Sequence, residues 1–384
     1  MAHPDVAVIG AGVFGVWTAR HLRATGRTVV LVDGHGSGHP RAASGGESRI
    51  IRVGYGDRAL YSTWAREALP QWQRLFDEAG EALFQRTGVL WFARPDDSAT
   101  EVTARTVESL GVPLERLDQR ALRERFPQFD VEPYAGGLFE PESGVLLARR
   151  AVALAARDAR RHGVEYRLAA AAPIEPSSGA AGLASLPLAD GSRLSAGTFV
   201  FACGAWMPRL FPRLLGPLIR PTRQEVGFLG PPAGDERFAP PAMPAWIDRG
   251  AEAYGLPALD GRGAKVALHE HGPAFDPETG DRMPTARAME AVRAAAAERL
   301  PGLRNAPLVE ARVCQYANTW NGDLLLDRHP ETENVWLAGG GSGHGFKLGP
   351  AVGAYLTGRM DGSRREEALV GLASKRPEPD RHVF

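Results

Sequence analysis

Residues 6–15 of this 384-residue chain read VAVIGAGVFG, and this stretch decides the fold. The apolar run at 6–9 predicts a strand buried on both faces, and residues 13–24 predict a helix that ends near Gly26. A second apolar run at 28–32 predicts another buried strand. Strand, helix and strand within about thirty residues are typical of a doubly wound α/β domain.

The glycine spacing between this strand and helix predicts a dinucleotide site. Gly10 permits a tight turn, Gly12 lets the backbone approach a pyrophosphate, and Gly15 lets the helix pack on the strand. The helix N-terminus offers N–H groups to the phosphates. Asp33 ends the second strand, where a carboxylate accepts hydrogen bonds from ribose hydroxyls. The motif disfavours a 2′-phosphate but does not separate FAD from NAD.

Three further features favour a flavin. The small-residue loop at 42–49 contains Ser44 and ends in Arg49, which can lie against the pyrophosphate or the flavin ring. Residues 203–206 follow a buried strand, like a second crossover that touches the cofactor. Residues 339–347 join a buried strand to a helix and are rich in glycine, so their backbone can approach a flat ligand. The dipole of the following helix favours negative charge on that ligand.

The composition indicates a soluble enzyme. Lys plus Arg and Asp plus Glu are both 45, which gives no basic field for nucleic acid. The 44% of hydrophobic residues exclude a disordered chain. Two cysteines, no long apolar span and no signal peptide predict a cytoplasmic protein without a membrane partner. Only three of the cations are lysines, Lys265, Lys347 and Lys375.

Several motifs together carry a resemblance to a known family. The most specific are VCQY at 313–316 and SGHGFK at 342–347. The others are GAG at 10–12 with Asp33, SRIIR at 48–52 before Tyr55-Gly56, TGVL at 87–90, FEPESGVL at 139–146 and GAW at 204–206. Over roughly residues 5–358 the chain resembles amine-oxidising flavoenzymes related to D-amino acid oxidase. Within them it is similar to the monomeric sarcosine oxidase and N-methyltryptophan oxidase group.

Dinucleotide-type pattern at both ends and in the middle of the chain, with β-rich insertions between, predicts an α/β protein with two domains, each built from discontinuous segments. A Rossmann-like, glutathione-reductase-type FAD-binding domain is expected from residues 1–83, 143–207 and 318–384. An α+β substrate domain with a large, mostly antiparallel sheet is expected from 84–142 and 208–317. The alternating turns and short apolar runs of the second segment favour antiparallel strands on their own.

The resemblance also implies covalent FAD, joined through the sulfur of Cys314 to the flavin 8α-methyl group. A thiolate is the nucleophile that such a bond requires. Cys203 is interpreted instead as a small buried residue. Further cofactor contacts are expected from Gly10, Gly12, Gly15, Asp33, Ser44, Arg49, Gly343, Gly345 and Lys347.

The remaining site residues are assigned by the same resemblance. Lys265 is expected beside flavin N5, where an ammonium stabilises the charge that develops on oxygen. Arg52 and Lys347 are expected to bind a substrate carboxylate. The other residues expected to face the substrate are Tyr254, Tyr316 and His269, although two ordinary sheet tyrosines remain an alternative for the first two. Lys375, in the polar tail, is interpreted as a solvated surface charge.

Two positions depart from the family pattern. Sarcosine-oxidising members carry a histidine where this chain has Gly45, which removes an imidazole from the predicted rim of the site and favours a bulkier or differently polar substrate. The region at 230–262, rich in Pro and Gly, is interpreted as a lid. His269 and His271 form an HxH pair, which is poor evidence for a metal, so no metal site is predicted.

The resemblance therefore implies an enzyme, expected to be monomeric, that oxidises a secondary amine, most simply an N-alkyl or cyclic amino acid. A hydride equivalent would pass to flavin N5, leaving an imine, and oxygen would be reduced to hydrogen peroxide. One alternative is a flavin dehydrogenase or a cyclic imine-forming oxidase of secondary metabolism. The others are an NAD-dependent dehydrogenase and a flavin-binding protein without turnover.

Overall fold

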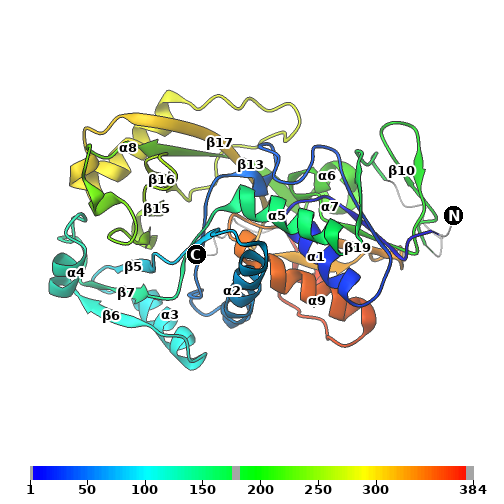
Figure 1. Ribbon diagram of the computed structural model, residues 1–384, viewed down its shortest axis with the longest axis horizontal. Helices are drawn as coiled ribbons and strands as arrows, with labels where there is room; N and C mark the ends of the chain where they lie inside the picture. Colours follow the sequence, from blue (N-terminus) through cyan, green and yellow to red (C-terminus); the bar gives the residue numbers. More distant parts are fainter. Residues whose placement is uncertain (1–2, 175–181, 378–384) are drawn as a thin grey trace.

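A six-stranded sheet forms the centre of one half of the molecule in the computed structural model, which describes residues 3–174 and 182–377 (Figure 1). Its order is β18-β19-β12-β1-β2-β9, and all neighbours are parallel except β18 and β19. The strands are β1 (Val6–Ile9), β2 (Val29–Asp33), β9 (Glu165–Leu168), β12 (Thr198–Phe201), β18 (Leu325–Arg328) and β19 (Val335–Gly339). This sheet confirms the predicted doubly wound domain.

Long helices cover one face of this sheet, and a small hairpin with two short helices covers the other. The first face carries α1 (Val13–Ala24), α2 (Ala59–Ala79), α5 (Ala148–Arg161) and α9 (Gly349–Asp361), whose apolar side chains form one core. The second face packs on β10 (Leu186–Pro187), β11 (Arg193–Leu194), α6 (Met207–Leu210) and α7 (Pro212–Leu215). Because both faces are covered, the apolar runs of β1 and β2 are continuous rather than alternating.

An eight-stranded sheet forms the other half, and it is antiparallel apart from the pair of β14 and β5 (Figure 1). Its order is β17-β13-β16-β15-β14-β5-β7-β6. The strands are β5 (Val89–Ala93), β6 (Glu115–Asp118), β7 (Gly136–Glu140), β13 (Ile219–Leu229), β14 (Ala245–Asp248), β15 (Ala253–Leu256), β16 (Ala264–Leu268) and β17 (Leu308–Thr319). The helices of this half are α3 (Ser98–Ser109), α4 (Gln119–Arg125) and α8 (Ala286–Arg299). The predicted large antiparallel sheet is thus confirmed.

A third, three-stranded sheet contains strands from both predicted domains. It consists of β3 (Arg49–Ile51), β8 (Gly144–Leu146) and β4 (Phe84–Gln85). The strands of the two large sheets come from the segments expected for each domain, apart from the last two residues of β17. The domain boundaries remain our proposal.

The interpretation of 230–262 as a lid is wrong. This region supplies β14 and β15, which lie inside the eight-stranded sheet with hydrogen-bonded neighbours on both sides. Trp246 and Leu256 in these strands are fully buried. Apart from Gly255, which lies within β15, the prolines and glycines of the region stand in the connections between core strands.

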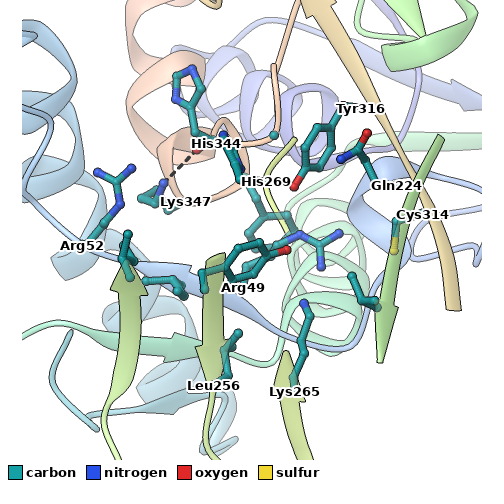
Figure 2. A pocket seen from close by; sticks show the side chains of 16 residues that line it. Arg49, Arg52, Gln224, Leu256, Lys265, His269, Cys314, Tyr316, His344 and Lys347 are labelled. Atoms are coloured by element: carbon teal, nitrogen blue, oxygen red, sulfur yellow. Dashed lines mark hydrogen bonds between the residues drawn. The ribbon is translucent and has the colours of Figure 1, made fainter. Parts of the chain in front are cut away.

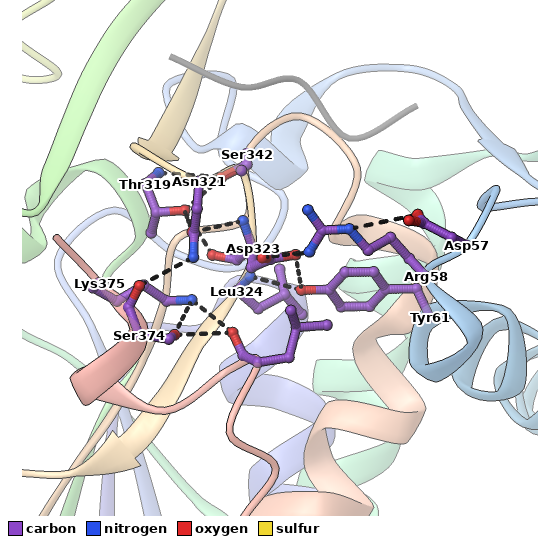
Figure 3. Close-up of polar contacts among 12 residues, drawn as sticks. Asp57, Arg58, Tyr61, Thr319, Asn321, Asp323, Leu324, Ser342, Ser374 and Lys375 are labelled. Carbon is purple, nitrogen blue, oxygen red and sulfur yellow. Dashed lines mark hydrogen bonds and ion pairs between the residues drawn. The ribbon is translucent and has the colours of Figure 1, made fainter. Parts of the chain in front are cut away.

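The interpretation of Lys375 as a solvated charge is also wrong, because its side chain is 5% exposed. Its Nζ donates to Leu369 O at 2.8 Å and to Ser374 Oγ at 3.1 Å (Figure 3). Burial lowers the pKa of Lys375 to about 8. Lys375 thus lies near Asp323, whose carboxylate accepts hydrogen bonds from Arg58 and Tyr61.

None of the helices in the part of the chain that the structure describes is both long and apolar enough to span a membrane. The same residues contain no group of three His, Cys, Asp or Glu side chains placed to hold a metal ion.

Candidate active site

A cavity of about 400 Å³ opens at the carboxyl ends of β1, β2 and β12, where a doubly wound sheet binds its ligand. Four of the residues predicted to bind the cofactor line it, namely Gly10, Gly12, Asp33 and Ser44. The crossover at 203–206 lines it too, as predicted. Cys203 Sγ donates to Ile9 O at 3.2 Å, and burial raises the pKa of this thiol. The interpretation of Cys203 as a small buried residue stays a prediction, because the residue is half-buried at the wall of the cavity.

Backbone N–H groups organise the polar atoms of this cavity. Asp33 Oδ2 accepts from Ala11 N at 2.7 Å, and Oδ1 accepts from His35 N and Gly36 N at 2.8 and 2.7 Å. Ser44 Oγ accepts from Val13 N at 3.0 Å, at the N-terminus of α1. The Ser44 hydroxyl hydrogen and the remaining lone pairs of Asp33 suit a phosphate and ribose hydroxyls, respectively. These residues fit the nucleotide part of FAD.

Gly15 and Gly345, which were also expected to contact the cofactor, do not line this cavity; they let neighbouring segments approach closely. A Cβ atom on Gly15 would lie 1.7 Å from Gly10 O, so α1 packs directly on the glycine turn. A Cβ atom on Gly345 would lie 2.8 Å from the ring of Phe14. The two glycine-rich loops are thereby held against the same end of α1.

A second cleft lies between the two halves of the molecule and collects the other predicted residues (Figure 2). These are Arg49, Arg52, Tyr254, Lys265, His269, Cys314, Tyr316, Gly343 and Lys347. The lining also includes Ile50, Gln224, Val226, Ile247, Leu256, His344 and Phe346. Among the described residues, its lining includes four Arg or Lys side chains and no Asp or Glu. The cleft therefore suits negatively charged ligands.

Lys265 and Arg49 supply positive charge on one side of the cleft. Lys265 is 4% exposed, and its Nζ donates to Ser48 O at 3.3 Å. Burial and the nearby Arg49 guanidinium lower the pKa of Lys265 to about 7. Arg49 donates to Ser48 O and Ala43 O, both at 2.8 Å, which holds its guanidinium in place.

Arg52 and Lys347 supply positive charge on the other side of the cleft (Figure 2). The guanidinium of Arg52 lies 4.2 Å from the ring centre of Tyr55 and 4.6 Å from that of Trp91, and it donates to Gly54 O. Burial lowers the pKa of Arg52, and burial followed by the Arg52 charge lowers the pKa of Lys347 well below its ordinary value. An anion between these groups would stabilise both charged forms.

Tyr254 and Tyr316 form the aromatic part of the cleft and hydrogen-bond to each other. Burial raises the pKa of both phenols, so both are neutral at physiological pH. The ring of His269 lies 6.4 Å from that of Tyr254 and 5.9 Å from that of Tyr316. Gly343 has a φ of +75°, and a Cβ atom there would lie 2.6 Å from the Tyr316 ring, so this position requires glycine.

Cys314 lies on β17, paired in register with Gln224 of β13, and its thiol is free. It lines the cleft on the same side as Lys265 and away from Arg52 and Lys347 (Figure 2). Its position fits the predicted anchor for one edge of a flavin ring.

The sequence reasoning assigned no role to Gln224, Tyr55 or His344. Gln224 Nε2 donates to Glu270 O at 2.8 Å and its Oε1 accepts from Gly272 N at 2.9 Å, so it holds the loop that follows His269. No local pattern marks this contact. Tyr55 and His344 stand inside the family motifs, which is the signal that could have identified them.

Gly45 does not face the cleft, contrary to the predicted gap at its rim. A Cβ atom at this position would lie 1.9 Å from His39 O. The backbone of residues 39–45 folds back on itself here, and Gly45 O accepts from Arg149 Nε at 2.9 Å. A histidine side chain has no room in this loop.

Comparison with known protein families agrees with this geometry. The family model described as "DAO: FAD dependent oxidoreductase" matches residues 5–359. The chain belongs to the DAO family. Membership makes it an FAD-dependent oxidoreductase and replaces the alternative of an NAD-dependent dehydrogenase.

Curated members of the DAO family are similar over most of their length. Monomeric sarcosine oxidase of Bacillus sp. (strain NS-129) is 30% identical, with 92% of each chain covered. N-methyl-L-tryptophan oxidase of Salmonella heidelberg (strain SL476) is 28% identical, covering 91% of this chain and 92% of the relative. Among solved structures, L-proline dehydrogenase from P. horikoshii has a TM-score of 0.82 at 20% identity, with 96% of each chain covered. That structural likeness shows the shared fold.

Proposed function

We propose that this protein oxidises a secondary amine that carries a carboxylate, such as an N-alkyl or cyclic amino acid. The observation that carries the proposal is the cleft, whose described lining residues include a cationic pair on each side and two tyrosines but no Asp or Glu. The names of the sarcosine and N-methyltryptophan oxidases support the same substrate class.

Arg52 and Lys347 would bind the substrate carboxylate, since they approach it from neighbouring directions as a fork and a point charge. The rings of Tyr254 and Tyr316 would contact the amine and its substituent. Ile50, Ile247 and Leu256 provide an apolar wall for the carbon skeleton. These contacts would orient the neutral amine so that its carbon–hydrogen bond faces the cofactor.

FAD, when bound, accepts the hydride equivalent from the amine and passes two electrons to an acceptor. Asp33, Ser44 and the turn at Gly10–Gly12 would hold its nucleotide part, and Cys314 would bind its ring covalently. We propose oxygen as the acceptor, so that amine and oxygen give imine and hydrogen peroxide. Lys265 would stabilise negative charge on oxygen from its buried position.

The experiment that tests covalent attachment is spectral. The purified protein is expected to be yellow and to keep its flavin absorbance after acid precipitation, whereas the Cys314→Ala variant should release the flavin into the supernatant. The Cys203→Ala variant is the matched control and should keep the flavin bound. Release of flavin from the unaltered protein would contradict the covalent bond but not FAD binding.

The experiment that tests the reaction is anaerobic bleaching of the bound flavin. The panel contains N-methyl amino acids, proline and pipecolate, with primary amino acids as controls. Bleaching by secondary amino acids, followed by recovery and peroxide formation on adding air, is the expected result. Bleaching without recovery in air would favour the alternative of a dehydrogenase, and no bleaching by any member would favour a flavoprotein without turnover. The cytoplasmic location and the monomeric state remain predictions.

A further inference from the structure

Lys347 is held by a short chain of buried hydrogen bonds. Its Nζ donates to Tyr55 Oη at 2.7 Å and to His344 O at 2.9 Å, and all three side chains are less than 5% exposed. The main chain is fixed as well, because Trp72 Nε1 donates to Lys347 O at 3.0 Å. The ammonium therefore has a defined place at the wall of the cleft.

The direction of each hydrogen bond in this chain follows from the donors and acceptors. His344 Nε2 lies 3.0 Å from Gly322 O, and a carbonyl only accepts, so Nε2 carries the hydrogen. Burial and the charge of Lys347 lower the pKa of His344, which keeps the ring neutral and leaves a lone pair on Nδ1. That lone pair faces Tyr55 Oη at 3.3 Å.

The role of Tyr55 follows from the charge of Lys347, which an anion in the cleft would favour. A protonated Lys347 only donates, so Tyr55 Oη accepts from its Nζ. The Tyr55 hydrogen then faces His344, whose Nδ1 lies at 3.3 Å and whose backbone O lies at 3.4 Å. A protonated Lys347 carries three N–H groups, of which Tyr55 and His344 O take two. The third remains for a ligand in the cleft that Lys347 lines.

Tyr55 also contacts the second cation of this side. The guanidinium of Arg52 lies 4.2 Å from the centre of the Tyr55 ring, so the face of the ring touches Arg52 while its hydroxyl binds Lys347. One side chain thus sets the spacing of both cations, and this spacing decides whether one carboxylate can bind both.

We propose that Tyr55 and His344 are positioning residues for the substrate carboxylate: the Tyr55 hydroxyl, oriented by His344 Nδ1, holds the Lys347 ammonium charged and directs its third N–H into the cleft beside Arg52. This inference rests on the proposed function, in which Lys347 binds the carboxylate. It adds to that function two residues that need not touch the substrate.

The test compares an acid with its uncharged analogue in the Tyr55→Phe variant of the holoenzyme. The probes are cyclopentanecarboxylate and cyclopentanecarboxamide, titrated against the absorbance of the bound flavin. The variant keeps the ring, and with it the contact to Arg52, but removes the acceptor for Lys347. Affinity for the acid is expected to fall at least tenfold, while affinity for the amide changes less than twofold.

Tyr61→Phe is the matched control. Tyr61 is buried beside Tyr55, with ring centres 5.4 Å apart, but its hydroxyl binds Asp323 and Leu324 rather than Lys347 (Figure 3). The Tyr61→Phe variant should change the affinity for both probes less than twofold.

A second pair of variants, His344→Leu and His344→Gln, separates the hydrogen bonding of His344 from its packing, because Gln restores a donor and an acceptor. The Leu variant should lower the affinity for the acid more than the Gln variant does.

The possible results distinguish the positioning role of Tyr55 and His344 from the proposed carboxylate site itself. If Lys347→Met weakens acid binding but Tyr55→Phe does not, the positioning role is wrong and the proposed carboxylate site stands. Equal weakening of acid and amide by Tyr55→Phe would also overturn the positioning role. If the unaltered enzyme does not bind the acid, or Lys347→Met leaves its affinity unchanged, the carboxylate site itself is wrong and the inference falls with it.

Discussion

The nucleotide cavity and the amine cleft are built in opposite ways. In the nucleotide cavity, the hydrogen bonds that shape the site join residues of one supersecondary unit and the loop that follows it. Ala11 N donates to Asp33 across 22 residues, and Val13 N donates to Ser44 across 31. In the amine cleft Lys265 reaches Ser48 across 217 residues and Lys347 reaches Tyr55 across 292. The first uses backbone N–H groups, and the second uses the buried side chains of cations.

The nucleotide cavity and the amine cleft therefore differ in the free energy needed to hold their polar groups in place. Backbone N–H groups at a helix end are already organised by the helix, so the nucleotide cavity needs little more than glycine spacing. Buried ammonium groups are unfavourable without a partner, and the pKa values of Lys265 and Lys347 are both lowered by burial. The amine cleft therefore favours anionic ligands, and substitution of Arg52 or Lys347 there should affect substrate far more than FAD.

The largest effect is expected from Lys347→Met. Loss of a buried charge that binds the carboxylate costs several kcal/mol, so kcat/KM should fall about 1,000-fold. The flavin content should stay unchanged, because the nucleotide cavity is untouched. Steady-state kinetics with absorbance spectra check both statements.

Lys375→Met is the control for this variant, because it also replaces a buried lysine but one that does not line either cavity. It should lower the melting temperature and leave kcat/KM within about threefold, as expected for a change outside the site. Equal losses of activity in both variants would mean that the effect of Lys347→Met is one of stability.

The second-largest effect is expected from Lys265→Met, on the rate at which oxygen reoxidises the flavin. With a pKa of about 7, Lys265 carries its charge below this pH and loses it above, so the rate of flavin reoxidation by oxygen should decline as pH rises through this range. Lys265→Met should slow reoxidation about 100-fold and remove this dependence on pH. Stopped-flow mixing of the reduced enzyme with oxygen measures both. An unchanged pH profile in the variant would assign the titration to another group.

A smaller effect is expected from Gly343→Ala. The added methyl group would lie 2.6 Å from the Tyr316 ring, so the ring must move away from the substrate. Such overpacking costs about 1–3 kcal/mol, and KM should rise about tenfold while flavin content is preserved. Steady-state kinetics with the amine that bleaches the flavin fastest measure KM, and absorbance spectra measure the flavin content. A variant that loses FAD instead would show that this loop serves the cofactor rather than the amine.

The smallest effect on turnover is expected from Gly45→His. The side chain would meet the backbone of His39, so the melting temperature should fall while the order of preferred substrates stays the same. Thermal unfolding and the amine panel measure these two properties. Gain of sarcosine oxidation without loss of stability would show that position 45 faces the cleft after all.

The sequence could predict the nucleotide half almost residue by residue, because its signals are local. The positions of Gly10, Gly15 and Asp33 relative to the flanking strands follow from β-α-β geometry alone. The cleft residues were predicted through family resemblance, and the structure brings them together. Gln224 could not be found, because its contact with Gly272 spans 48 residues and leaves no periodic pattern.

Two of the three corrections, those at 230–262 and at Lys375, have the same origin. Residues 230–262 contain turn-forming residues that are typical of loops, yet β14 and β15 are buried by strands from distant segments. Lys375 lies in a polar stretch, yet it is covered by Leu369 and Ser374 and lies near Asp323. Burial is a property of the assembled chain, and local composition does not report it.

The sequence by itself determined the strand-helix-strand unit near its start and the dinucleotide turn within that unit. These depend on residue spacing within one supersecondary unit, which hydrogen-bond geometry fixes locally. Only the tertiary structure decided that Arg52, Tyr55 and Lys347 meet, that His344 orients Tyr55, and that Gly45 is closed off by His39. Contacts between distant segments follow from how two sheets pack around one cleft, so no local pattern specifies them.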